Sequence, residues 1–357
     1  MRRSGSEGMR SEGMRSEGMR GERQSLTVLI TAFREAGTIG RALEAFLGQV
    51  PADAEILVVC PDVETTAVIQ QYAACHPQIR HAPDPGKGKP AALNIGLQAA
   101  RGEIVVFSDG DVYVGDGALA ALLAPFADPQ TGAVTGQPVS LSPRGTRLGY
   151  WSHLLVGGAH RERLAREAAG EFLLCSGYLF AVRKRLLIAA GGEMARGDDV
   201  TRATAVPRHP APTTLPTRIT HHASRAKSPI PEDALAEDAV ISHMIAQQAY
   251  RIRYAPEAKV YVKYPDTYAD WLRQKVRSAG GYAQEYVQSS PYRMRSAGRE
   301  ARRGTIFALK FAQSPRELWW TLLLFLARLH LWLLVFWQVK VRQRPLPELW
   351  QRVESTK

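Results

Sequence analysis

The sequence has 357 residues, of which 45% are hydrophobic and 22% are charged. This is the composition of a globular chain with one large or two ordinary domains, so it excludes wholesale disorder, collagen-like rods and coiled coils. Three cysteines at unrelated spacings exclude a disulfide framework and a cysteine-rich zinc site, and they fit a reducing compartment. The net charge of +12 leaves nucleic acid, a membrane surface or a phosphorylated ligand as possible partners.

The positive charge is concentrated in the last quarter of the chain. Residues 271–357 contain 16 Lys and Arg against 5 Glu and no Asp, which accounts for +11 of the total. The same region contains the longest apolar run, 318–337, which has basic residues on both sides. Basic flanks around an apolar segment favour lipid as the partner, and nucleic acid is not expected.

The first 24 residues contain three tandem copies of Ser-Glu-Gly-Met-Arg. Such a segment buries too little apolar surface to offset its ordering entropy, so we expect residues 1–24 to be a disordered tail. It has no apolar stretch like that of a signal peptide, and export is therefore not expected.

From Ser25 onward, short apolar runs alternate with helical patterns, which predicts βαβ units in an α/β fold with a mainly parallel sheet. Ligands of such sheets bind beyond the carboxyl ends of the strands. The expected strands are 26–32, 55–60, 79–82 and 103–108, and the expected helices are 39–48, 65–75 and 90–100.

The second half of this domain, which we expect to cover 25–290, is less regular. Residues 194–230 are rich in proline and predict a long surface loop or an insertion. The other expected elements are helices at 117–126, 148–168, 231–250 and 268–288, and strands at 131–140, 251–254 and 259–262.

Two carboxylates follow the fourth predicted strand, in Asp109-Gly110-Asp111. Acidic residues at i and i+2 with a glycine between them can hold a hard divalent cation that keeps positions open for phosphate oxygens. A solvated Asp-Gly turn is the alternative for this motif taken alone.

A glycine- and lysine-rich loop, 86–96, leads into the third predicted helix. Helix N-terminal amides together with Lys87 and Lys89 suit a diphosphate, although ordinary solvated lysines would look the same. The spacing matches neither a Walker loop nor G-x-G-x-x-G.

Taken in order, these motifs resemble family-2 glycosyltransferases with the GT-A nucleotide-diphospho-sugar transferase fold. The resemblance covers roughly residues 25–281. It is carried by segments 31–35, 60–62, 86–96, 109–111, 176–183, 236–238, 250–256 and 274–277.

The resemblance implies roles for individual residues. Glu35 and Asp62 would contact the nucleoside, and Asp109 and Asp111 would bind Mg²⁺ or Mn²⁺ on the donor diphosphate. Asp238 would be the general base of an inverting displacement. Glu237, Gln274 and Arg277 would lie in the acceptor or diphosphate region, although Ser278 stands where the family has a tryptophan.

The apolar run 318–337 lies in an expected membrane-associated segment, 303–344, which a tail of 345–357 follows. Tryptophans near both ends of the run fit a membrane belt, whereas Arg328 and His330 lie near its middle, where an arginine is costly. The run could span the bilayer, lie in its interface, or pack against a second protomer. Because sugar nucleotides are cytosolic, a catalytic domain would face the cytoplasm.

The sequence therefore predicts a membrane-associated, metal-dependent inverting glycosyltransferase. Its partners would be a UDP- or GDP-sugar donor, a lipid-linked or glycan acceptor, and membrane lipid. A sugar nucleotidyltransferase is the alternative enzyme, but it should have an arginine-containing glycine loop after the first strand, which 31–37 lacks. The remaining alternative is a non-catalytic basic protein that binds membrane or nucleic acid.

Overall fold

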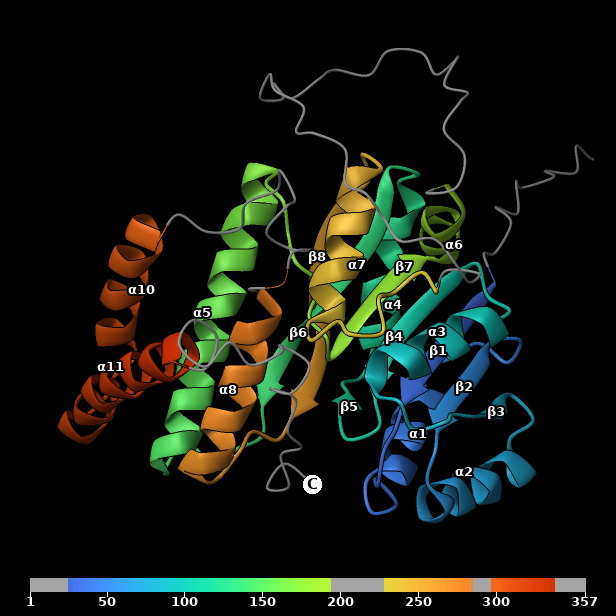
Figure 1. The fold of residues 1–357 in the computed structure, drawn as a ribbon, viewed down its shortest axis with the longest axis horizontal. Coiled ribbons are helices and arrows are strands. Elements are labelled where there is room, and N and C mark those ends of the chain that lie inside the picture. Colours follow the sequence, from blue (N-terminus) through green and yellow to red (C-terminus); the bar gives the residue numbers. More distant parts are fainter. Residues whose placement is uncertain (1–24, 194–227, 283, 285–296, 338–357) are drawn as a thin grey trace, which may run out of the picture.

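The structure is a computed structural model that describes residues 25–193, 228–282, 284 and 297–337. The expected tails at 1–24 and 345–357, and all but the last three residues of the expected loop 194–230, lie outside this range. Within it, helices surround one central sheet, and further helices form a layer at one side of it (Figure 1).

The sheet has eight strands in the order β3-β2-β1-β4-β7-β6-β8-β5. The first four in this order are parallel, β7 is antiparallel to β4 and β6, and β8 runs parallel to β6. The strands are β1 Leu26–Thr31, β2 Glu55–Cys60, β3 Ile79–Pro83, β4 Ile104–Asp109, β5 Tyr113–Val114, β6 Thr131–Ser140, β7 Leu179–Arg183 and β8 Arg251–Val262.

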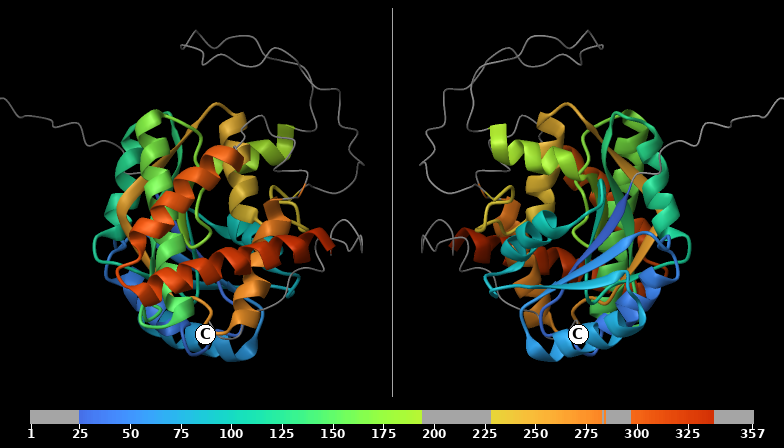
Figure 2. Two further views of the ribbon diagram at one scale, coloured as in Figure 1. Left: turned by 90° about the vertical axis from the view of Figure 1, so that its left-hand side faces the viewer. Right: turned by 90° about the vertical axis from the view of Figure 1, so that its right-hand side faces the viewer.

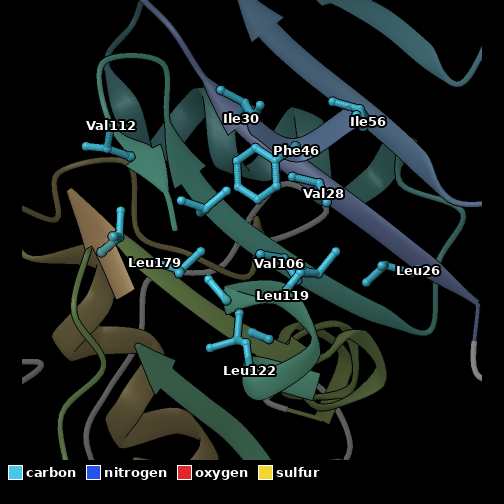
Figure 3. Packing of buried hydrophobic residues seen from close by; sticks show 14 of the residues in the cluster. Leu26, Val28, Ile30, Phe46, Ile56, Val106, Val112, Leu119, Leu122 and Leu179 are labelled. Carbon is cyan, nitrogen blue, oxygen red and sulfur yellow. The ribbon is translucent and has the colours of Figure 1, made fainter. Parts of the chain in front are cut away.

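Both faces of the sheet are covered by helices, which explains why its inner strands are continuous apolar runs. Figure 3 shows one face, where Phe46 packs on Val28 and Ile30, and the neighbouring Leu29 points into the opposite core. The first face is covered by α1 Ile39–Leu47, α2 Val63–Cys75 and α4 Ala118–Leu123 with a 3₁₀ turn at Ala124–Ala127, and the other by α3 Lys89–Ala99, α6 Lys184–Glu193 and α7 Glu237–Gln247.

A further helical layer lies beside the β6–β8 end of the sheet (Figures 1 and 2). It consists of α5 Arg147–Ala169, α8 Tyr268–Tyr282, α10 Ala297–Phe311 and α11 Pro315–Phe336. The α11 helix has 22 residues with a mean hydropathy of 1.8 over its most apolar window, so it is long and apolar enough to cross a membrane. Its backbone is tied to α5, because the Trp151 Nε1–H donates to the Trp320 carbonyl at 2.7 Å.

The helix predicted at 268–288 is α8, Tyr268–Tyr282, and most of its predicted last turns lie outside the described residues. Two other predicted elements differ more from the structure. The helix expected from residue 231 begins at Glu237, because residues 231–236 form an irregular, partly buried segment. The two short strands expected at 251–254 and 259–262 are one strand, β8, whose pairing with β6 includes two shifts of register. Those irregularities let the pairing continue past Pro256.

Candidate functional site

The predicted site lies at the carboxyl ends of the parallel strands β1, β2 and β4. Thr31 and Asp109 are paired in the register of β1 and β4, and the Thr31 hydroxyl donates to Asp109 Oδ1 at 3.4 Å. The turn after β4 approaches β1 closely: a Cβ on Gly110 would lie 2.3 Å from Glu35 Oε2. The same Cβ would lie 3.0 Å from the Ala32 Cβ, so a side chain at position 110 would displace Glu35 and crowd the end of β1.

Glu35 and Asp62 are joined through Thr65 in the first turn of α2. Glu35 N–H donates to Thr65 Oγ1 at 2.8 Å, while Thr65 N–H donates to Asp62 Oδ1 at 2.9 Å. Asp62 is the N-cap of α2 and also accepts from Arg34 N–H at 2.6 Å. Burial acts to raise the pKa of Asp62, but these hydrogen bonds hold it below its ordinary value, so the residue is ionised.

Lys89 connects two predicted motifs that are far apart in sequence. Its ammonium lies 2.7 Å from Asp109 Oδ1 and 2.8 Å from Glu237 Oε1. The three side chains are only 28%, 22% and 13% exposed, respectively. The first turn of α3 thereby holds the end of β4 against the first turn of α7.

The charges of this cluster shift one another's pKa values. Burial acts to lower the pKa of Lys89, but Asp109 and Glu237 raise it above the ordinary value, so the ammonium remains charged. Burial acts to raise the pKa of Glu237, but Lys89 holds it below its usual range. Burial raises the pKa of Asp109, and the negative charge of Asp111 adds to the effect despite Lys89.

Asp238 lies beside this cluster in the first turn of α7. Its two carboxylate oxygens accept hydrogen bonds from Gly177 N–H at 3.0 Å and from Ala239 N–H at 2.9 Å. Burial, and after it the charge of Glu237, raise the pKa of Asp238 to about 6. A fixed carboxylate with that pKa is ionised at neutral pH and basic enough to accept a proton.

Asp109 and Asp111 are suited to a divalent cation. Burial is the main cause of the raised pKa of Asp109, and the charge of Asp111 adds to it; a bound cation would counter both effects. In the part of the chain that the structure describes, no group of three His, Cys, Asp or Glu side chains could hold a metal by itself. The protein would therefore supply two carboxylates and leave positions for phosphate oxygens, as is usual for Mg²⁺.

The loop before α3 places the two predicted lysines differently. Gly88, the N-cap of α3, has φ of 103°, a backbone conformation that favours glycine, and its neighbour Lys89 turns into the cluster. Lys87 stays exposed on the loop. Of the two lysines, only Lys87 is exposed to solvent, whereas Lys89 is held in the cluster.

Helix α8 contains two residues predicted for the site, Gln274 and Arg277, and only Arg277 interacts with the cluster among the described residues. The charge of Arg277 acts on Glu237 and on the buried Tyr178 phenol. Gln274, one turn earlier, has a buried Oε1, and among the described residues no hydrogen bond joins that atom to the cluster.

Tyr178 is a further residue of the site that the sequence did not identify. Burial raises the pKa of its phenol to about 12, and the charges of Arg277, Asp109 and Asp111 also act on it. Tyr178 directly follows Gly177, whose N–H donates to Asp238. Both residues lie in segment 176–183, one of the segments that carry the family resemblance. Its place in that segment, next to Gly177, is the sequence signal that could have identified Tyr178 as a site residue.

Two buried amides anchor the segment that leads into α7. The side chain of Asn94 donates to the Ile230 carbonyl at 2.7 Å and accepts from the Ile230 N–H at 3.0 Å. Gln284 bonds in the same way to the Leu235 N–H at 2.7 Å and the Asp233 carbonyl at 2.8 Å. These anchors set the direction from which Glu237 and Asp238 enter the site.

Comparison with known proteins gives consistent matches. The profile of the family described as "Glycosyltransferase like family 2" matches residues 23–281. "Probable glycosyltransferase YdaM" of Bacillus subtilis (strain 168) is 24% identical over 270 residues, which are 73% of this chain and 56% of that protein. The chain thus spans just over half the length of this relative.

A solved structure with the same fold is that of the mannosyltransferase PcManGT from Pyrobaculum calidifontis in complex with GDP-Man and Mn²⁺. It superposes with a TM-score of 0.52 at 20% identity, covering 92% of this chain and 84% of that one. At this identity the match shows the fold alone. It confirms the GT-A architecture that the sequence predicts.

Proposed function

The chain belongs to the glycosyltransferase-like family 2, and from that premise we propose that it is a metal-dependent, inverting glycosyltransferase of the hexosyltransferase type. Its donor would be a UDP- or GDP-sugar and its acceptor a lipid-linked or glycan hydroxyl. The curated relative bears the name of a glycosyltransferase, and the mannosyltransferase with the same fold was solved with GDP-Man and Mn²⁺. Both support the proposal.

The observation that carries the proposal is the ion cluster that joins Asp109 to Glu237 through Lys89 and sets Asp238 beside it. In the proposed reaction, Asp238 takes the proton of the acceptor hydroxyl as its oxygen attacks the anomeric carbon. The bond from that carbon to the diphosphate oxygen breaks, and the nucleoside diphosphate leaves on the opposite side. One displacement of this kind inverts the anomeric configuration.

The other residues would bind and orient the donor. Glu35 and Asp62 would contact the nucleoside, whereas Lys87 and Arg277 would approach the diphosphate; Gln274 would contribute to the acceptor region from α8. Asp109 and Asp111 would hold Mg²⁺ or Mn²⁺. When bound, the cation neutralises charge on the leaving diphosphate.

A donor screen tests this function. The full chain in membranes is given UDP- and GDP-sugars in turn, and release of the nucleoside diphosphate is measured with Mn²⁺, with Mg²⁺ and with chelator. We expect turnover with at least one donor and its loss on chelation.

Asp111→Ala should lower that turnover by roughly 10²-fold or more, because one of two metal ligands is lost. Asp116→Ala, a change to an exposed aspartate five residues later, is the matched control and should retain wild-type turnover. Equal rates for wild type and Asp111→Ala would refute the metal assignment, and no turnover with any donor would refute the proposed function.

A further inference from the structure

Helix α11 presents two apolar stripes on opposite sides along its length. One stripe is buried and consists of Trp320, Thr321, Leu324, Ala327, Leu331 and Val335. The other is exposed and consists of Leu318, Trp319, Leu322, Leu326, Leu329, Trp332, Leu333, Phe336 and Trp337. The helix is long and apolar enough to cross a membrane because both of its sides are apolar.

The buried stripe is covered by the catalytic domain from its first turn to its last. Near the start, the Tyr150 hydroxyl of α5 lies 2.7 Å from Thr321 Oγ1. Near the end, Leu331 and Val335 pack with Val276 of α8 and with Leu235, two residues before Glu237. Figure 2 shows α11 lying across the outside of α5 and α8.

This packing is incompatible with α11 crossing a bilayer. Charged groups lie close to α11: Arg144, in the loop before α5, pairs with Glu317 in the first turn of α11 at 2.8 Å, and α8 carries the Asp270–Arg273 pair at 2.7 Å. A bilayer around α11 would enclose these groups and their helices in hydrocarbon, which is costly for each charge. Because the catalytic domain covers the buried stripe, a partner can reach the exposed stripe only from the side of α11 that faces away from the domain.

Lipid fits that outer side better than protein. Three of the exposed side chains are tryptophans, the residue type enriched at membrane interfaces, and α10 extends the surface with Ile306 and Leu309. A groove of about 330 Å³ adjoins the stripe at Leu326 and is bordered by Arg147 and His330. Basic side chains lie on α11 itself, at Arg316 and Arg328, in addition to Arg147 at the groove. Apolar residues beside cations match the surface of an anionic bilayer.

We propose that α10 and α11 dock in the plane of an anionic bilayer surface, with α11 lying in the interface and not crossing it. The catalytic domain and both ends of α11 are then on the same side of the membrane. The proposal deepens the membrane association that the sequence predicts. It is independent of donor turnover, so either can fail without the other.

Cysteine accessibility tests the geometry in the full chain. Cys75 is the exposed native cysteine of the described residues, so it serves as the marker of the domain's side and is replaced by Ser for the other measurements. Single cysteines are placed at Gln313, before α11, and at Lys340, after it. In inverted membrane vesicles of expressing cells, an impermeant maleimide should label both positions as it labels Cys75, and in intact cells neither. Labelling of positions 313 and 340 from opposite sides would overturn the proposal.

Vesicle binding tests the partner. Leu322→Glu with Leu329→Glu should lower binding to phosphatidylglycerol-containing vesicles by more than about tenfold, because both exposed side chains would be inserted. Ile188→Glu changes an equally exposed apolar residue on α6 and should leave binding unchanged. Unchanged binding by the double variant, or a detergent-free dimer that the double variant makes monomeric, would overturn the proposal in favour of another occupant of this face.

Discussion

The arrangement of Lys89 shows how one residue can serve both structure and chemistry. Its ammonium neutralises Asp109 and Glu237, two carboxylates contributed by different motifs. Without it, two partly buried negative charges would face each other, and a buried carboxylate that loses its partner is strongly destabilising. The motif position of Lys89 was visible in the sequence, but its partners were not, because Glu237 is 148 residues further along the chain.

The raised pKa of Asp238 predicts the pH dependence of transfer. The carboxylate must be unprotonated to accept a proton, so activity is lost as pH falls through the pKa of about 6, and not near the ordinary value of 3.8. Below that midpoint, kcat/KM should fall by about tenfold per pH unit, as measured by nucleoside diphosphate release.

Glu237→Gln removes a negative charge that raises the pKa of Asp238, so the midpoint should move to lower pH. The exposed Glu232→Gln is the matched control and should leave it in place. A wild-type midpoint near pH 4, or one that Glu237→Gln does not shift, would exclude Asp238 as the group that titrates.

At the scale of elements, segments with a clear hydrophobic period were predicted within a few residues. β6 was expected at 131–140 and spans Thr131–Ser140. The start of α7 was predicted wrongly. Local propensity favours a helix from residue 231, but Asn94 and Gln284 hold residues 230–235 in a non-helical path through backbone hydrogen bonds.

The Asn94 anchor leads to a prediction about this segment. Asn94→Ala leaves the Ile230 N–H and carbonyl without these partners in a buried position, so the free energy of unfolding should fall by about 1–3 kcal/mol. Turnover should fall by roughly tenfold, since the segment positions Glu237 and Asp238. Chemical denaturation and the release assay measure the two effects. Gln70→Ala, which truncates an exposed amide on α2, should change neither; a wild-type stability for Asn94→Ala would show that the anchor is dispensable.

At the scale of the molecule, the proposed membrane-contact surface lies apart from the cluster proposed to be catalytic, and the two regions differ in charge and apolar surface. The first 270 residues are nearly neutral, and the cationic excess lies in the region that includes α8, α10 and α11. The sequence could predict that this region meets lipid, but it left three geometries open. The packing of α11 on α5 and α8 is the observation from which we argue against a span, and the sequence could not show it, because it depends on contacts such as Trp151 with Trp320 across 169 residues.

The site, too, depends on contacts between residues that are far apart in the sequence. The resemblance to a known family identified Asp109, Asp111, Glu237 and Asp238 as candidate site residues from the sequence alone. The sequence could not show that Gly177 fixes Asp238, or that Lys87 and Lys89 have different surroundings. Both depend on how β4, β7, α3 and α7 pack together in the folded chain.

In the proposed mechanism, Asp238 accepts the proton of the acceptor hydroxyl during sugar transfer. The most direct measurement is single-turnover release of nucleoside diphosphate by Asp238→Asn, with donor affinity measured on the same folded sample and Glu232→Gln as the control. We predict unchanged donor affinity and a release rate lowered by roughly 10²–10⁴-fold, the usual contribution of a general base. Release by Asp238→Asn at the wild-type rate would contradict the account.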